Sequence, residues 1–175
     1  MAPFNRYQTF AVVRAVCEAG RENDITLYTG NDDNIVVDLL TEYKIATTKG
    51  VKKIRIRGGL LGHFCVWTQK AVELLAEIHE ITEKNLPVPQ ALLTKAIEVT
   101  DCNAALFDTA NNFAGCIPGI HEVLRRQGLL KGTWCLNPHE VLSPGQSVEL
   151  DRVCKSYPHL IDDDFIRANL KKWLI

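Results

Sequence analysis

The spacing of apolar residues changes from a strand period to a helix period within residues 24–43. Residues 25–29 (Ile-Thr-Leu-Tyr-Thr) form a short β-prone run, and Gly30 interrupts it. Asn31, Asp32 and Asp33 then open a segment whose apolar residues recur at helical spacing: Ile35, Val36, Leu39, Leu40 and Tyr43. We therefore expect a strand at residues 25–29 and a helix that begins at the three polar residues. A strand that leads directly into a helix is the unit of an α/β fold.

The flanking segments extend this unit. Residues 7–19 carry one apolar face and stop before Gly20, which predicts a helix with a glycine C-cap. Residues 54–57 (Ile-Arg-Ile-Arg) alternate apolar and basic positions, and Lys49-Gly50 marks a turn, which predicts a β-hairpin over residues 43–57 with one solvated face. Residues 58–67 predict a second apolar strand, and residues 68–83 predict a long helix. The right-handed crossover rule makes the strands at 25–29 and 58–67 parallel neighbours or near neighbours.

Beyond residue 87 the pattern is helical throughout. It predicts a helix over residues 90–111, another from Pro118 that Gly128 ends, and a third with Ser143 as N-cap and Gln146 completing a capping box. Three aspartates at 162–164 open a final helix. Two parallel strands alone do not make a stable sheet, so we expect this chain to be incomplete or to be completed by a partner.

Composition excludes some classes of protein. The chain has 175 residues and a formal net charge of −1, which gives no general attraction to nucleic acids or membranes. No apolar run approaches the ~20 residues that cross a bilayer, and the N-terminus has no hydrophobic signal core, so we expect a cytoplasmic protein. The basic hairpin face is either solvated or contacts an anion or a partner. Tyr43 is its only aromatic residue, which disfavours base stacking and hence nucleic acid.

The six cysteines are scattered and form no CxxC pair, and the histidines are also dispersed. We therefore expect free, mostly structural thiols, no metal site and no cofactor.

The polar residues after the first strand have two interpretations. Asn or Asp at a helix N-terminus satisfies backbone N–H groups and the helix dipole. The carboxyl end of a strand in an α/β fold is also where ligands bind. Position alone does not decide between capping and substrate binding.

Four motifs follow one another along the chain: Thr29-Gly30-Asn31-Asp32, Gly59-Leu-Leu-Gly62-His-Phe-Cys65-Val66, the segment from Gly115 to Gly128, and Leu142-Ser143-Pro144. In this order and at this spacing they resemble the C-terminal part of the dihydrodipicolinate synthase / N-acetylneuraminate lyase family of Schiff-base aldolases. The first resembles the family's Ser-Gly-Asp-Asp at the end of barrel strand seven, and the second resembles the strand-eight pattern. The third is similar to a helix of the family's C-terminal extension, and the fourth is similar to the start of the next helix.

The resemblance implies a partial (β/α)8 barrel. Residues 1–86 would form its last two strand-helix units, with the hairpin at 43–57 as an insert, and residues 87–175 would form a helical extension. Members of this family are carbon-carbon lyases that bind pyruvate or a related 2-keto acid as an imine on a lysine, with a relay tyrosine nearby. Both residues belong to segments with no counterpart in this chain. The resemblance therefore implies no catalytic residue here and a chain that is inactive alone.

The resemblance also implies a set of substrate-binding residues. Gly30 would let the backbone turn close to the substrate, and Asn31 and Asp32 would bind its end distal to the imine. Gly62 and Cys65 would line the floor of the pocket. Cys65 stands where the family has serine, which implies a divergent pocket.

Two further interpretations stay open beside the aldolase portion, whose partner would be the missing N-terminal half-barrel. The chain could be a non-catalytic module that binds a sugar acid or keto acid, or that assembles as a homo-oligomer through its strand edges. The hairpin could instead contact nucleic acid, with a strong salt dependence.

Overall fold

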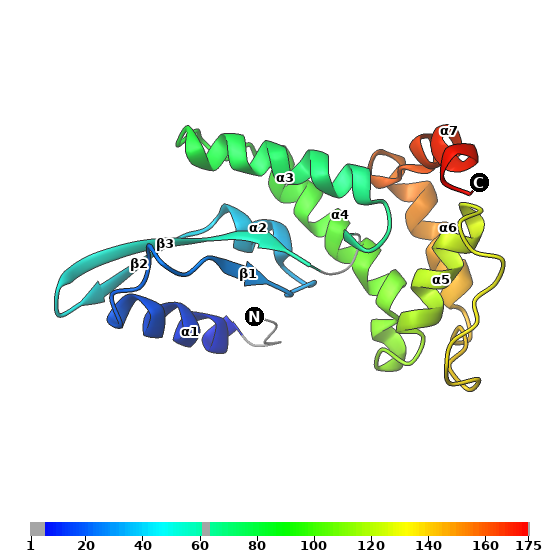
Figure 1. Ribbon diagram of the computed structural model, residues 1–175, viewed down its shortest axis with the longest axis horizontal. Helices are drawn as coiled ribbons and strands as arrows, with labels where there is room; N and C mark the ends of the chain where they lie inside the picture. Colours follow the sequence, from blue (N-terminus) through cyan, green and yellow to red (C-terminus); the bar gives the residue numbers. More distant parts are fainter. Residues whose placement is uncertain (1–5, 61–63, 175) are drawn as a thin grey trace. The chain divides into compact units, whose positions relative to one another are not determined.

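The structure, a computed structural model, describes residues 6–60 and 64–174. Within these residues the chain is an α/β protein with seven α-helices and a three-stranded mixed sheet of order β1-β3-β2 (Figure 1). The predicted α/β class is confirmed. The described strands form an open sheet, so a partial barrel is not established by these strands alone.

The sheet joins a parallel pair to an antiparallel hairpin. β1 (Leu27–Thr29) runs parallel to the end of β3 (Gly50–Gly59), with Leu27 opposite Ile56 and Thr29 opposite Gly59. β2 (Glu42–Thr47) runs antiparallel to the first part of β3, from Glu42 opposite Arg55 to Thr47 opposite Gly50. Gly50 has φ 99°, a conformation that favours glycine and places it beside the tight turn. The predicted hairpin is therefore present.

The predicted strand at residues 58–67 is confirmed only for Gly58 and Gly59, which end β3 and pair in parallel with β1; residues 61–63 lie outside the described residues. β3 ends at Gly59, and within residues 64–67 the backbone turns, with Trp67 at φ 54°. The parallel neighbour of β1 is instead the end of the second hairpin strand, so the hairpin is continuous with the sheet rather than an insert. Gly59 has no space for a side chain, because a Cβ there would lie 2.6 Å from Cδ1 of the buried Ile35.

Helices α1 and α2 pack on this sheet. α1 (Arg6–Glu18) contacts β2 and β3 and buries Val13 and Cys17, and Gly20 follows it with φ 69° as predicted. α2 (Ile35–Leu40) contacts β3 and is shorter than predicted.

The prediction that Asn31, Asp32 and Asp33 open the second helix is wrong. Asp32 and Asp33 lie in a turn before it, and the N-cap is Asn34, which makes no side-chain capping hydrogen bond. The helix also does not reach Tyr43, because β2 begins at Glu42. Strand pairing with β3 therefore prevails over the helical spacing of the last apolar positions.

Two longer helices follow the sheet. α3 (Thr68–Glu83) has the predicted limits and buries Ala71, Leu74 and Ile78. α4 (Gln90–Phe107) ends before residue 111 because Asp108 adopts a left-handed conformation at φ 60°, after which a 3-10 turn covers Thr109–Asn111.

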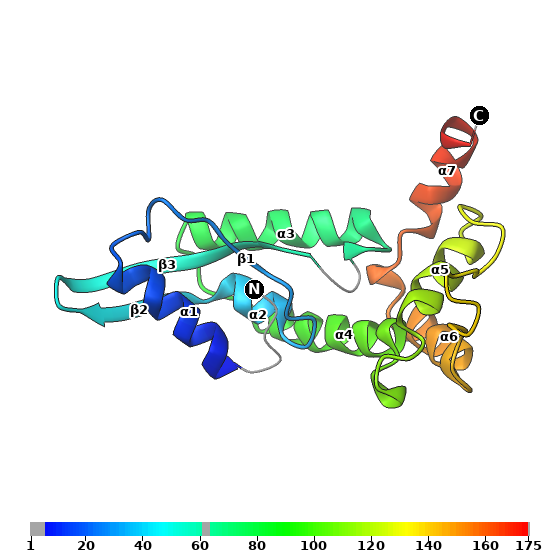
Figure 2. The same cartoon turned by 60° about the horizontal axis from the view of Figure 1, so that its bottom comes forward.

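The remaining helices are α5 (Cys116–Arg126), α6 (Gln146–Ser156) and α7 (Asp163–Trp173), and α5 packs beside α6 (Figures 1 and 2). Gly128 ends the α5 segment with φ 80°, as predicted. Ser143 is not the N-cap of α6; Gly145 is, at φ 86°. The capping-box contact nevertheless forms in part, because the Ser143 N–H donates to Oε1 of Gln146 at 3.2 Å.

The described residues divide into two compact units. The first contains residues 6–60 and 75–96, and the second contains residues 64–74 and 97–174. No helix in either described part combines the length and apolar character needed to cross a membrane.

Candidate functional site

The carboxyl ends of β1 and β3 lie at the same edge of the sheet. The two strands are parallel, and the N–H of Leu60 donates to the carbonyl oxygen of Thr29 at 3.0 Å. The residues that follow β1, Gly30, Asn31 and Asp32, therefore leave the sheet beside the residue that follows β3. In α/β proteins this edge is where ligands bind.

Asn31 is buried and connects three elements. Its Nδ2 donates to Oγ1 of Thr9 on α1 at 3.2 Å and to Oδ2 of Asp38 on α2 at 3.1 Å, and its N–H donates to Oγ1 of Thr29 at 3.1 Å. Its Oδ1 is buried and has no hydrogen-bond partner in the described part of the chain. These contacts occupy both amide hydrogens, so the side chain fixes the turn after β1 from within. The predicted contact of Asn31 with a substrate stays a prediction.

Asp38 is the most deeply buried of the aspartates described at this sheet edge. It is 1% exposed, and besides Asn31 it accepts hydrogen bonds from Nη2 of Arg6 at 2.8 Å and from Nδ2 of Asn34 at 3.1 Å. Burial raises the pKa of the Asp38 carboxyl, while the Asn31 and Arg6 contacts act in the opposite direction. The sequence analysis did not select this residue. The sequence does contain a sign of its burial, because Asp38 is the one charged residue in the otherwise apolar helix Ile-Val-Val-Asp-Leu-Leu.

Asp32 is also largely buried, in the turn before α2. Only 8% of it is exposed, and burial raises the pKa of its carboxyl above the ordinary aspartate range. The neighbouring Asp33 is exposed and raises that pKa further by charge repulsion. Among the predicted substrate-binding residues, Asp32 is the one at the sheet edge whose pKa is raised.

The other two predicted site residues do not belong to this group. Gly62 lies outside the described residues. Cys65 belongs to the second unit, where it is exposed and where desolvation by nearby protein raises the pKa of its thiol. A raised pKa keeps sulfur in the thiol form, which is a weak nucleophile. All six cysteines are free, as predicted.

An imine-forming lysine needs a desolvated site that lowers its pKa. No lysine of this chain is fully buried, and all of its lysines lie within the described residues. Three are partly buried, and each forms an ion pair with a carboxylate: Lys52 with Glu22, Lys70 with Glu73, and Lys95 with Glu77. None of them lies in the desolvated, uncompensated site that imine formation requires.

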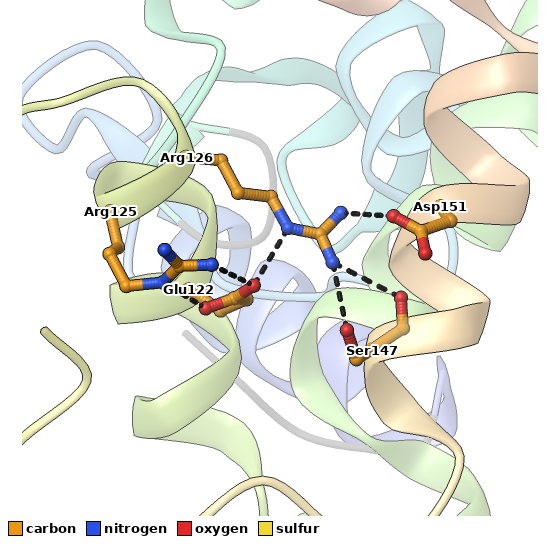
Figure 3. Close-up of polar contacts among 5 residues, drawn as sticks. All are labelled: Glu122, Arg125, Arg126, Ser147 and Asp151. Atoms are coloured by element: carbon orange, nitrogen blue, oxygen red, sulfur yellow. Dashed lines mark hydrogen bonds and ion pairs between the residues drawn. The ribbon is translucent and has the colours of Figure 1, made fainter.

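A different acid, Glu122 on α5, has the most strongly lowered carboxyl pKa of the second unit, at about 2. Hydrogen bonds from Arg125 are the main cause, and Arg126 adds to them. Arg126 also donates to Asp151 and Ser147 of α6, so the group connects the two helices (Figure 3). Its guanidinium and carboxylate groups satisfy one another, which gives it a structural role. The described residues hold no cluster of side chains suited to a metal ion.

No protein-family model, no curated protein and no solved structure matches this chain.

Proposed function

We propose that this chain is the C-terminal portion of a Schiff-base aldolase similar to dihydrodipicolinate synthase and N-acetylneuraminate lyase, a carbon-carbon lyase for pyruvate or a related 2-keto acid. The observation that carries the proposal is the parallel pairing of β1 with the end of β3. It brings the Thr29-Gly30-Asn31-Asp32 motif and the glycines at the end of β3 to one edge, as neighbouring barrel strands would. In the proposed enzyme Asp32 binds the distal part of the substrate.

We further propose that the imine forms on a lysine outside this chain. The support is the environment of the chain's own lysines, which are exposed or are paired with carboxylates when partly covered. An N-terminal half-barrel of the same fold would supply the lysine and cover the free edge of the sheet. The keto acid would be the shared ligand of the two parts.

Borohydride reduction in the presence of pyruvate tests both statements, because it converts a transient imine into a stable amine that mass spectrometry can locate. The chain alone is expected to give no adduct. When it is mixed with a lysine-bearing upstream half-barrel, an adduct should form on that partner. An adduct on a lysine of this chain would refute the assignment of the lysine, and no adduct in any mixture would refute the aldolase function.

An Asp32→Asn variant, beside Asp33→Asn as a control of equal charge change, tests the proposed substrate contact. Asp32 is largely buried at the sheet edge whereas Asp33 is exposed. The yield of trapped imine in the mixture should fall for the Asp32 variant and stay near wild type for the Asp33 variant. Equal yields for the two variants would remove Asp32 from the substrate site.

A second candidate, a non-catalytic assembly or binding module, is favoured by the strand ends of the sheet. β2 pairs with β3 only as far as Glu42 opposite Arg55, and β3 continues to Gly59. Among the described strands, β1 and β2 are both edges. Strand edges promote association, so this candidate predicts a folded, monodisperse dimer of the chain alone in light scattering. A folded monomer that binds neither keto acid nor sugar acid would exclude it.

A further inference from the structure

A pocket of about 300 Å³ lies at the amino end of β1, away from the carboxyl-end edge that forms the candidate site. It is bounded by the connection from α1 to β1, at residues 22–26, and by the middle of β3. Three cationic side chains of β3 line it: Lys53, Arg55 and Arg57. All of these residues belong to the first unit.

The one acidic residue that lines this pocket, Glu22, forms an ion pair with Lys52. One oxygen of Glu22 accepts a hydrogen bond from Nζ of Lys52 at 2.5 Å, and this contact lowers the pKa of the Glu22 carboxyl. The side chain of Glu22 is only 7% exposed. The charge of Lys52 therefore balances that of Glu22, and the three pocket cations remain in excess, although the second carboxylate oxygen of Glu22 is buried without a hydrogen-bond partner among the described residues.

Among the described residues, Glu42 is the one further carboxylate within 4 Å of the hairpin cations. Glu42 lies 3.7 Å from Nζ of Lys53, 3.6 Å from Nη2 of Arg55 and 3.7 Å from Nζ of Lys44. These distances exceed those of direct charge-assisted hydrogen bonds. The guanidinium of Arg57 has no hydrogen bond or ion pair within the described residues. The pocket therefore carries an excess of positive charge.

One of the cations is held in place. Arg55 is only 17% exposed, and its Nη1 donates to the carbonyl oxygen of Leu40 at 3.0 Å. A guanidinium fixed in this way loses little conformational entropy when it binds an anion, and its planar donors suit the oxygens of phosphate. Lys53 and Arg57 are more exposed and can adjust to a ligand.

We propose that this pocket binds the phosphate group of a small molecule. A small ligand fits better than nucleic acid for two reasons. Three of the hairpin cations gather at one pocket of about 300 Å³, and the hairpin offers only Tyr43 as an aromatic surface for a base. The site does not depend on the proposed aldolase function and lies at the opposite end of β1 from the substrate edge.

Titration of the full chain at low ionic strength, followed by backbone amide NMR, tests the proposal. The probes are inorganic phosphate and glycerol 3-phosphate, which separate free phosphate from a phosphate ester as the source of the group. Saturable shifts should appear at residues 22–26 and 53–57. An RNA oligonucleotide that binds more tightly than both probes, or shifts spread over lysines across the chain, would overturn the proposal.

Arg57→Gln and Lys49→Gln remove the same charge from the same hairpin, and only Arg57 lines the pocket. Loss of a charge-assisted contact should weaken phosphate binding about tenfold for Arg57→Gln and less than about twofold for Lys49→Gln. Arg57→Lys should fall between them, because it keeps the charge and loses the paired donors. Lys53→Gln provides a second pocket variant if Arg57→Gln does not fold. Equal weakening by pocket and control variants would show general charge attraction only and would refute the site.

Discussion

The Glu122→Gln substitution tests how much the ion pairs between α5 and α6 contribute to the stability of the second unit. Glu122 is 5% exposed, and its two oxygens accept hydrogen bonds from Nε and Nη2 of Arg125, at 2.7 and 2.9 Å, and from Nε of Arg126 at 2.8 Å. Arg126 continues to Asp151 and Ser147 on α6 (Figure 3). Glutamine keeps the size of the side chain and removes the charge that organises both arginines.

The magnitude follows from the acidity of Glu122. A pKa of about 2 in the folded chain, against an ordinary value of 4.5, corresponds to about 3 kcal/mol of stability at neutral pH. The two arginines are partly exposed, and solvent screening reduces this value. We expect Glu122→Gln to lower the free energy of unfolding by about 2–3 kcal/mol at pH 7, which is a fall in Tm of about 4–12 °C for a chain of this size.

The pH dependence of unfolding distinguishes loss of the Glu122 charge from other effects of the substitution. Because the folded pKa of Glu122 lies below the unfolded value, its contribution is fully present above about pH 5 and is lost as the pH falls toward 2. Urea unfolding of both proteins at pH 7, 5 and 3 should therefore give curves that converge at low pH. About half of the difference or more should have disappeared at pH 3.

Asp164→Asn is the matched control, since Asp164 also pairs with an arginine three residues later, Arg167 at 2.7 Å, but is 96% exposed. An exposed pair of this kind contributes about 0–0.5 kcal/mol. Equal losses in the two variants, or a loss for Glu122→Gln that does not change with pH, would refute the reasoning.

Three further predictions concern packing, the sheet edge and the thiols. Gly119→Ala should cost about 3 kcal/mol or more in urea unfolding, because its Cβ would lie 2.2 Å from the backbone oxygen of Leu106. Asp38→Ala should cost about 2–4 kcal/mol and speed amide exchange around α2, because it leaves buried donors without an acceptor. In iodoacetamide labelling of the native chain Cys65 should react first and faster as the pH rises toward its raised pKa, whereas Cys102, buried and with a pKa of about 12, should react only after unfolding.

Much of the secondary structure could be predicted from local signals. Gly20 and Gly128 end helices in the positive-φ conformation expected of them, and the alternation through Ile54 and Ile56 belongs to a strand that buries both isoleucines. These signals work because each depends on the conformation of one or two residues. The hairpin turn beside Gly50 was predictable for the same reason.

The errors arose where tertiary pairing decided between two local patterns. Residues 58–67 are apolar enough for a strand, but β3 had already begun at Gly50 and its pairing with β1 is complete at Gly59. Likewise, helical spacing extends to Tyr43, but pairing with Ile54 places that residue in β2. Strand limits depend on partners that are distant in sequence, which a periodic pattern cannot contain.

At this sheet edge the sequence predicted which polar residues lie there, but it could not decide whether they have a structural role or bind substrate. α2 has six residues, too few for a helix to be stable by itself, so its position depends on buried contacts. Asp38 supplies one of these by binding Asn31 and Arg6, and thereby ties α2 to the turn after β1 and to α1. The motif at residues 29–32, which resembles a substrate site, therefore also connects β1, α1 and α2 through Asn31. Loss of imine formation in an Asn31 or Asp38 variant would therefore not distinguish loss of the proposed substrate contact from loss of these structural contacts.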